Sequence, residues 1–287
     1  MAKIQKILFP VDFSPSCTAV VPFVKRAAAM YSAKVTLLYV SEPSVSGFEV
    51  LARPAPEADD DCKTVACAKL RAYLSAELPS PECPRLLVVG EAASRIAAVA
   101  RDHDFDLIVM PTHAGLFRRM LLGSTTAKVL NDADCLVFTT QHAETLTPRP
   151  LEHREWVCAI GLSADSQRVL RVASELAETA QANLSLIHAV PPASRAPAAR
   201  LHLEERVESL ERQGALDRIH ELQRAVGSHA QVSVAVGPIK DALTERARQL
   251  QADALIIGRS SQPGAQGRLR DLTYAMVRDA PCPVISV

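Results

Sequence analysis

The sequence predicts an α/β protein made of two tandem, five-stranded, parallel, doubly wound domains related by internal duplication. Short segments recur in the same order at a constant spacing: Asp132–Cys135 (DADC) returns 147 residues later as Asp279–Cys282 (DAPC), and Val88–Gly90 returns as Ala235–Gly237. Within each half, short apolar runs alternate with longer helical patterns. The runs are nearly continuous, which indicates parallel strands covered by helices on both faces.

In the first half we expect five strands with helices between them. The first helix should begin at Pro15, because Ser14 is a favourable N-cap and proline is favoured at the first helical position. The expected strands are Ile4–Val11, Lys34–Val40, Arg85–Gly90, Asp106–Pro111 and Cys135–Thr140. The expected helices are Pro15–Tyr31, Asp59–Leu78, Ala92–His103 and Ser124–Asp132.

The second half repeats this order of elements. Its expected strands are Trp156–Leu162, Asn183–Val190, Gln231–Gly237, Ala254–Gly258 and Pro283–Val287. A polar, proline-containing stretch joins the halves. We therefore expect a first domain over 1–142, a linker over 143–154 and a second domain over 155–287.

Composition excludes several classes of protein. Lys and Arg together number 32, as do Asp and Glu, so a broad basic face for nucleic acid or anionic membrane is not expected. The cysteines number seven and form no Cys-x-x-Cys pair, which favours reduced thiols over a zinc site. The N-terminal apolar run is too short for a signal peptide, and no run is long enough to span a membrane. We expect a cytoplasmic protein without a metal site.

Ligands of doubly wound sheets bind at the carboxyl ends of the strands. Asp12 follows the first expected strand, where its carboxylate could accept a hydrogen bond from a base or a ribose. After the fourth strand, Gly123-Ser124-Thr125 opens a helix, and free N–H groups with two hydroxyls form a natural phosphate site. The same triplet is also an ordinary helix start. In the loop before it, His113 could face a phosphate or cap the loop.

These residues resemble the universal stress protein family. Ile7–Ser14 resembles the family's opening strand and turn, Thr36–Val40 its second strand, and Pro111–His113 with Leu121–Ser124 its nucleotide loop. The resemblance covers nearly the whole chain, twice. It implies a Rossmann-like, adenine nucleotide alpha hydrolase-like fold in both halves.

Members that bind ATP carry the loop Gly-x2-Gly-x9-Gly-Ser/Thr. The resemblance implies ATP, with Mg²⁺, in the first half. The implied contacts are Pro10, Val11, Asp12 and Val40 at the base, Met110, Thr112, His113 and Gly115 along the loop, and Gly123, Ser124 and Thr125 at the phosphates. The loop departs from the pattern, because Pro111 and Ala114 replace its first two glycines and the spacing is one residue short.

The second half departs further from the family pattern. Gly161 stands at the position of Asp12, and approximately Arg270-Asp271 stands at that of Gly123-Ser124. An aspartate at a helix start repels phosphate. We expect this half to be a mainly structural copy, in which Arg259 and its neighbouring arginines could still hold an anion.

Three functions remain open from the sequence. The leading one is a stress-response module that binds ATP or a related adenine nucleotide in its N-terminal domain with little or no catalysis; we expect no catalytic residue and find no Walker lysine motif. The second is a nucleotide-independent scaffold, because Leu136–Thr139 and Val284–Val287 are expected sheet edges. The family implies that such edges meet, as a pseudo-dimer of the two domains or in a homodimer. The third is a slow ATP hydrolase assisted by His113 or by water held at Asp12.

Overall fold

The computed structural model describes residues 4–42, 65–112, 122–141, 154–190, 201–259 and 271–287. The chain divides into two compact units, one within residues 4–137 and one within residues 138–287. The division falls inside the strand Leu136–Thr140. Each half is described below by itself.

The first half contains a parallel sheet with the strand order β3-β2-β1-β4-β5. Its strands are β1 (Lys6–Val11), β2 (Lys34–Ser41), β3 (Arg85–Val89), β4 (Leu107–Pro111) and β5 (Leu136–Thr140). β1 pairs in parallel with β2 from Lys6↔Lys34 to Val11↔Tyr39, and with β4 at Ile7↔Leu107. The chain order reverses between β1 and β4, which makes this the switch point of a doubly wound sheet.

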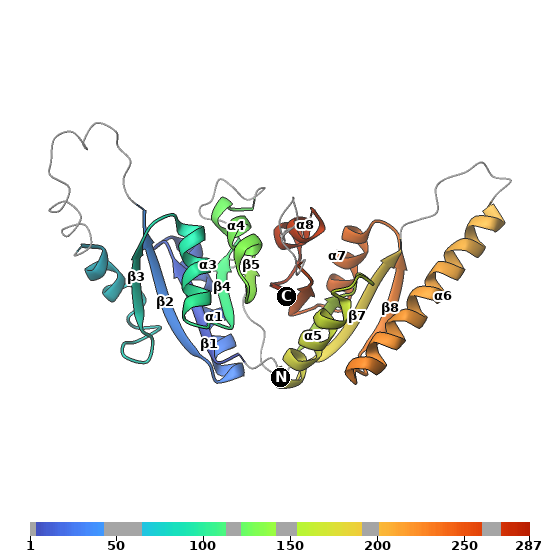
Figure 1. The fold of residues 1–287 in the computed structure, drawn as a ribbon, viewed down its shortest axis with the longest axis horizontal. Helices are drawn as coiled ribbons and strands as arrows, with labels where there is room; N and C mark the ends of the chain where they lie inside the picture. The colour runs from blue at the N-terminus through green and yellow to red at the C-terminus, as the bar shows by residue number, and fades with distance from the viewer. Residues whose placement is uncertain (1–3, 43–64, 113–121, 142–153, 191–200, 260–270) are drawn as a thin grey trace, which may run out of the picture. The chain divides into compact units, whose positions relative to one another are not determined.

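Helices cover this sheet, as the ribbons in Figure 1 show. They are α1 (Pro15–Tyr31), α3 (Ala92–Asp102) and α4 (Ser124–Asp132), with further helix over residues 65–72. The side-chain oxygen of Ser14 accepts a hydrogen bond from the Cys17 N–H at 3.2 Å and so caps α1 as expected. The helix expected up to Leu78 ends sooner, because the backbone turns at Leu74, where φ is 52°.

The second half repeats the arrangement with the order β10-β9-β6-β7-β8. Its strands are β6 (Glu155–Ala159), β7 (Asn183–Val190), β8 (Gln231–Val236), β9 (Ala254–Ile257) and β10 (Val284–Ser286). Its helices are α5 (Ser166–Ala180), α6 (Leu201–Val226), α7 (Ile239–Gln249) and α8 (Asp271–Asp279). The strand expected to reach Leu162 ends at Ala159, and Leu162 has φ 53° in the turn that follows.

Backbone details repeat between the halves and define which residues correspond. Phe13 and Leu162 both have positive φ, at 62° and 53°, just after the first strand of each half. The hydroxyl of Thr126 donates to the carbonyl of Pro111, and that of Thr273 donates to the carbonyl of Gly258. Counting from the pair Phe13 and Leu162, the counterparts of Asp12, Cys17 and Tyr39 are Gly161, Ser166 and His188.

Apolar side chains fill the interior of both halves. The largest fully buried ones come from strands and helices alike: Phe9, Ile7, Leu8, Leu37, Leu38, Ile108 and Leu130 in the first half, and Leu170, Leu176, Leu186, Ile187 and Ile219 in the second. Within the described ranges, all the cysteines are free and no helix is long and apolar enough to cross a membrane.

Candidate functional site

A cavity of about 210 Å³ lies in the first half at the carboxyl ends of β1, β2 and β4. The starts of α3 and α4 close its rim. Its described lining residues are Pro10, Val11, Asp12, Cys17, Leu38, Tyr39, Val40, Ala92, Ile96, Met110, Pro111, Gly123, Ser124, Thr125 and Thr126. The cavity therefore occupies the switch point at which doubly wound sheets bind ligands.

Most of the residues expected from the sequence to bind a nucleotide meet in this cavity. Those that line it are Pro10, Val11, Asp12, Val40, Met110, Gly123, Ser124 and Thr125. Thr112 is buried at 1% exposure and does not line the cavity; its carbonyl accepts a hydrogen bond from the Gly123 N–H at 2.8 Å. His113 and Gly115 lie outside the described residues.

Asp12 is held by the turn in which it sits. Its Oδ1 accepts a hydrogen bond from the Ser14 N–H at 2.9 Å, and the carboxylate lines the cavity, where it can accept a further hydrogen bond from a ligand. Phe13, the next residue, has φ 62°, a conformation that costs a residue with a side chain roughly 1–2 kcal/mol. Contacts of the Phe13 ring offset this cost.

The Phe13 ring sits in an aromatic cluster beside the cavity. Its centroid lies 4.5 Å from that of Tyr39, which lines the cavity, and 5.1 Å from that of Tyr73 in an edge-on arrangement. The ammonium group of Lys69 lies 4.3 Å from the same ring. The Tyr73 hydroxyl is hydrogen-bonded to that of Thr18 on α1 at 2.9 Å. The segment 65–73 is thereby joined to the turn that positions Asp12.

The helix starts at this cavity differ in how they are capped. At α3, Glu42 accepts from the Ala92 N–H at 3.0 Å, and Glu91 accepts from the Ser94 N–H at 2.8 Å. Glu91 also pairs with Lys128 at 2.9 Å, and the hydrogen bonds from Lys128 and Ser94 lower the pKa of Glu91 to about 2.

At α4 the N-cap is Gly123, which has no side chain with which to cap the helix. The Gly123 N–H is already bonded to the Thr112 carbonyl, so Gly123 itself does not offer that group to a ligand. The following N–H groups, of Ser124, Thr125 and Thr126, belong to the first turn, which has no intrahelical acceptor. These N–H groups, the hydroxyl of the exposed Ser124 and the hydroxyl of the half-buried Thr125 together suit the binding of an anion.

Cys17 contributes an unreactive thiol to the cavity wall. It is 2% exposed, and burial, reinforced by the nearby Asp12 carboxylate, raises its pKa to about 12. The thiol is therefore protonated at neutral pH and cannot act as a nucleophile.

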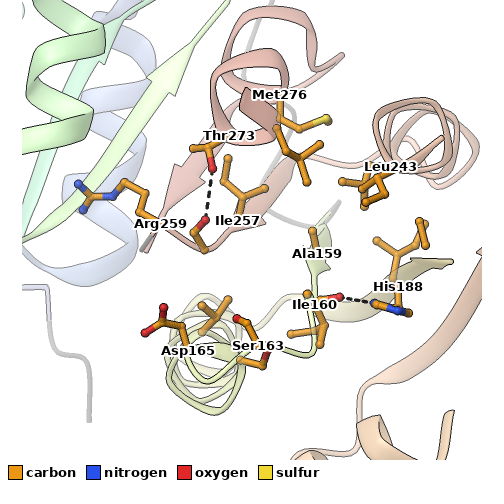
Figure 2. Close-up of a pocket in the computed structure, with 18 residues that line it drawn as sticks. Ala159, Ile160, Ser163, Asp165, His188, Leu243, Ile257, Arg259, Thr273 and Met276 are labelled. Atoms are coloured by element: carbon orange, nitrogen blue, oxygen red, sulfur yellow. Dashed lines mark hydrogen bonds between the residues drawn. The ribbon is translucent and has the colours of Figure 1, made fainter. Parts of the chain in front are cut away.

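The second half has a cavity of about 230 Å³ at the corresponding place (Figure 2). Its described lining residues are Ala159, Ile160, Gly161, Ser163, Asp165, Ser166, Val169, Ile187, His188, Ala189, Ile239, Leu243, Ile257, Gly258, Arg259, Leu272, Thr273 and Met276. The second half has thus kept the cavity of the first half as well as its fold. The sequence had led us to expect a mainly structural copy, because the residues of its nucleotide loop differ.

The polar groups of the second cavity differ from those of the first. Gly161 replaces Asp12, and His188 replaces Tyr39. The Nδ1 of His188 lies 2.6 Å from the Ile160 carbonyl, drawn as a dashed line in Figure 2. Arg259, which the sequence suggested as an anion ligand, has its guanidinium pointing away from the other labelled side chains in Figure 2.

Sequence reasoning missed several wall residues of the first cavity. Cys17, Tyr39, Ala92 and Ile96 all line it. Tyr39 precedes Val40 near the end of β2, so it could have been predicted from the rule that ligands bind at the carboxyl ends of the strands. Which helical side chains of α1 and α3 turn toward the cavity depends on packing, and no local motif signals it.

The sequence model of the Universal stress protein family matches residues 3–140 and 154–287. "Universal stress protein A homolog 2" of Coxiella burnetii is 32% identical over 139 residues, which cover 47% of this chain and 94% of that protein. The crystal structure of a universal stress protein from Archaeoglobus fulgidus has a TM-score of 0.68 and 17% identity, covering 100% of this chain and 97% of that one. A universal stress protein solved in complex with cAMP is 20% identical, with a TM-score of 0.37, over 48% of this chain and 97% of its own.

Proposed function

Since this chain belongs to the universal stress protein family, with both halves matched, we propose that its first half binds ATP or a related adenine nucleotide. The site is the cavity of about 210 Å³ at the switch point of the first sheet. The protein would act as a nucleotide-dependent stress-response module with little or no turnover, and its functional domains would span 1–142 and 155–287.

The observation that carries this proposal is the start of α4 at the rim of an apolar cavity, where no side chain of the described residues caps the helix. The neighbouring starts of α1 and α3 have their N–H groups bonded to Ser14, Glu42 and Glu91. α4 has Gly123 as its N-cap and no side-chain cap within the part of the chain that the structure describes, so we assign the phosphate oxygens to its N–H groups. Mg²⁺ would accompany the phosphates and offset their charge.

The remainder of the cavity suits the base. An apolar cavity of roughly 150 Å³ holds benzene, and drug-sized ligands need roughly 300–1,000 Å³. A volume of about 210 Å³ therefore fits one bicyclic ring, with sugar and phosphates extending toward α4. Val11 and Met110 offer apolar contact, and Asp12 offers an acceptor for an amino or hydroxyl group of the nucleoside.

The test is calorimetric titration of Mg-ATP into the full chain and into Gly123→Asp and Gly123→Asn. Gly123 has φ −59° and ψ 139°, which any residue can adopt, and both substituents are favoured N-caps. The two variants differ in one charge. We expect both variants to weaken binding, because an N-cap side chain competes with the phosphates for the N–H groups at the start of α4. Gly123→Asp should bind at least about tenfold more weakly than Gly123→Asn, because its carboxylate also repels the phosphates.

A second pair tests the base end of the cavity. Asp12→Asn should weaken ATP binding, whereas Gly161→Asp, at the corresponding position of the second half, should not. Absence of heat up to millimolar ATP would remove the nucleotide from the proposal and favour the scaffold function. ADP released faster than in a protein-free blank would instead favour the slow hydrolase.

A further inference from the structure

The second cavity has its own set of hydrogen-bonding groups, which are not those of a nucleotide site. A carbonyl oxygen only accepts, so the Nδ1 of His188 must donate its proton to Ile160 across the 2.6 Å that separates them. In the neutral ring, Nε2 is then the remaining acceptor. Tyr39, the counterpart of His188, has no equivalent ring acceptor.

Ser166 supplies a second polar group at this cavity. It lies at the start of α5, is 3% exposed, and its hydroxyl oxygen has no hydrogen-bond partner among the described residues. A buried hydroxyl without a partner costs free energy, so native structures seldom leave one unless something else supplies the bond. Its counterpart, Cys17, is a buried thiol with little need of a partner.

The charges of the described lining disfavour phosphate. Asp165 lines the cavity beside Ser163, where Figure 2 shows both at the start of α5. Arg259 is the one described lining residue with a permanent positive charge, and Figure 2 shows its side chain pointing away from the others. Asp165 pairs with Arg168 at 4.0 Å. An anion would therefore meet a carboxylate, and no cation of the described lining turns toward it.

The remaining walls are mainly apolar. Leu243 and Met276 lie opposite Ser163 and Asp165 in Figure 2, and Ile257 at the end of β9 also lines the cavity. A volume of about 230 Å³ lies between a cavity that holds benzene and one that holds a drug-sized molecule. One or two fused rings would fill it.

We propose that the second cavity is a separate binding site for an uncharged heteroaromatic molecule of one or two rings. The ligand donates one hydrogen bond to Nε2 of His188 and accepts one from the hydroxyl of Ser166. The two halves then respond to different molecules, a nucleotide in the first and an uncharged ring in the second. The proposal stands on the second half alone and does not require the first to bind ATP.

Methionine methyl groups allow each cavity to be observed separately. Met276 lines the second cavity and Met110 lines the first, and both are buried. The full chain, labelled with ¹³C at its methionine methyl groups, is titrated with benzimidazole at mildly alkaline pH, where this probe is uncharged. We expect a saturable shift of the Met276 signal. Titration with Mg-ATP should leave the Met276 signal in place, whatever happens to that of Met110.

Gly161→Phe provides the blocking variant. A Cβ at Gly161 meets no atom within 4 Å, so the new side chain can enter the cavity without backbone strain. We expect it to abolish the benzimidazole shift at Met276, whereas Asp12→Gly in the first half leaves it unchanged. An unmoved Met276 in the parent chain, an ATP-induced shift there, or an undiminished shift in a folded Gly161→Phe protein would overturn the proposal.

The two hydrogen bonds are tested with a second probe, 1-methylbenzimidazole, which lacks the donor. In the parent chain it should bind about three- to tenfold more weakly than benzimidazole. In His188→Phe the two probes should bind equally, because the acceptor is gone. Ser166→Ala should weaken both probes by about the same factor, and a preference for benzimidazole that survives in His188→Phe would overturn the assignment. Fluorescence of Trp156, in β6, checks that each variant is folded.

Discussion

Replacing Phe13 by alanine should destabilise the first half and loosen its candidate nucleotide site. Alanine keeps the positive φ that position 13 requires and removes the ring that packs on Tyr39, Tyr73 and Lys69. Each aromatic pair is worth roughly 0.5–1.5 kcal/mol and the cation contact roughly 0.5–1 kcal/mol. Because the Phe13 side chain is only half-buried, we take the lower part of the combined range, about 2 kcal/mol.

Leu162→Ala is the matched control for this loss. Leu162 occupies the corresponding turn with φ 53° and is also half-buried, but it has no aromatic ring to lose. Both variants keep the backbone strain and lose apolar surface. The excess cost of Phe13→Ala over Leu162→Ala therefore isolates the ring contacts.

Hydrogen exchange measured by mass spectrometry gives the local free energy of opening for peptides of α1 and β2, and for those of α5 and β7 in the control. Trp156, the chain's one tryptophan, reports denaturant unfolding of the second half. We expect Phe13→Ala to lower protection in α1 and β2 and to weaken ATP binding, because Asp12 loses its fixed position. Equal effects of the two substitutions in their own halves would refute the cluster's role.

Three further predictions concern charge, thiol chemistry and backbone. The pKa of Glu91 is lowered to about 2, so its contribution to stability is complete above the ordinary glutamate value of about 4.3 and is lost as the pH falls from there toward 2; Glu91→Gln should remove this part of the acid dependence of the unfolding midpoint. Cys17, with a pKa of about 12 and 2% exposure, should escape iodoacetamide in the native protein at neutral pH and react after denaturation, as read by peptide mass. Gly90 and Gly237 share φ 144°, so alanine at either should cost roughly 1–3 kcal/mol in a denaturant titration. The cost at Gly90 should be larger by about 1 kcal/mol, because the new Cβ would lie 2.6 Å from Nε of Arg95, displacing it from the Val89 carbonyl; equal costs would contradict this reasoning.

The elements that the sequence predicted most closely have local signals at their ends. The bounds of Pro15–Tyr31, Ser124–Asp132 and Asn183–Val190 are those of α1, α4 and β7. Ser14-Pro15 and Gly123-Ser124 mark helix starts through capping chemistry, which acts within a few residues. The helix expected over Asp59–Leu78 ends earlier in its described part, because hydrophobic periodicity continues past a turn that the backbone makes at Leu74.

The first cavity was predicted in outline because ligand sites of doubly wound sheets lie at strand ends, and those ends could be located from the sequence. The apolar wall of this cavity was not predicted, since the orientation of Cys17 and Ile96 depends on how α1 and α3 pack on the sheet. The role expected of Gly123 also changed. Its N–H donates to the Thr112 carbonyl, so in our proposal the donors for an anion are the N–H groups of the residues after it.

The sequence by itself determined the family, the duplication and the α/β class, because periodicity and repeated motifs are properties of residue order. The tertiary structure decided that the second half retains a cavity, although other residues stand at its positions for Asp12 and Gly123-Ser124. A cavity is set by the backbone framework and by side chains from β6, β7, β9 and the adjoining helices, which come from separate stretches of the chain between residues 159 and 276. Loss of a phosphate motif changes the polar groups in that space but not the framework that encloses it.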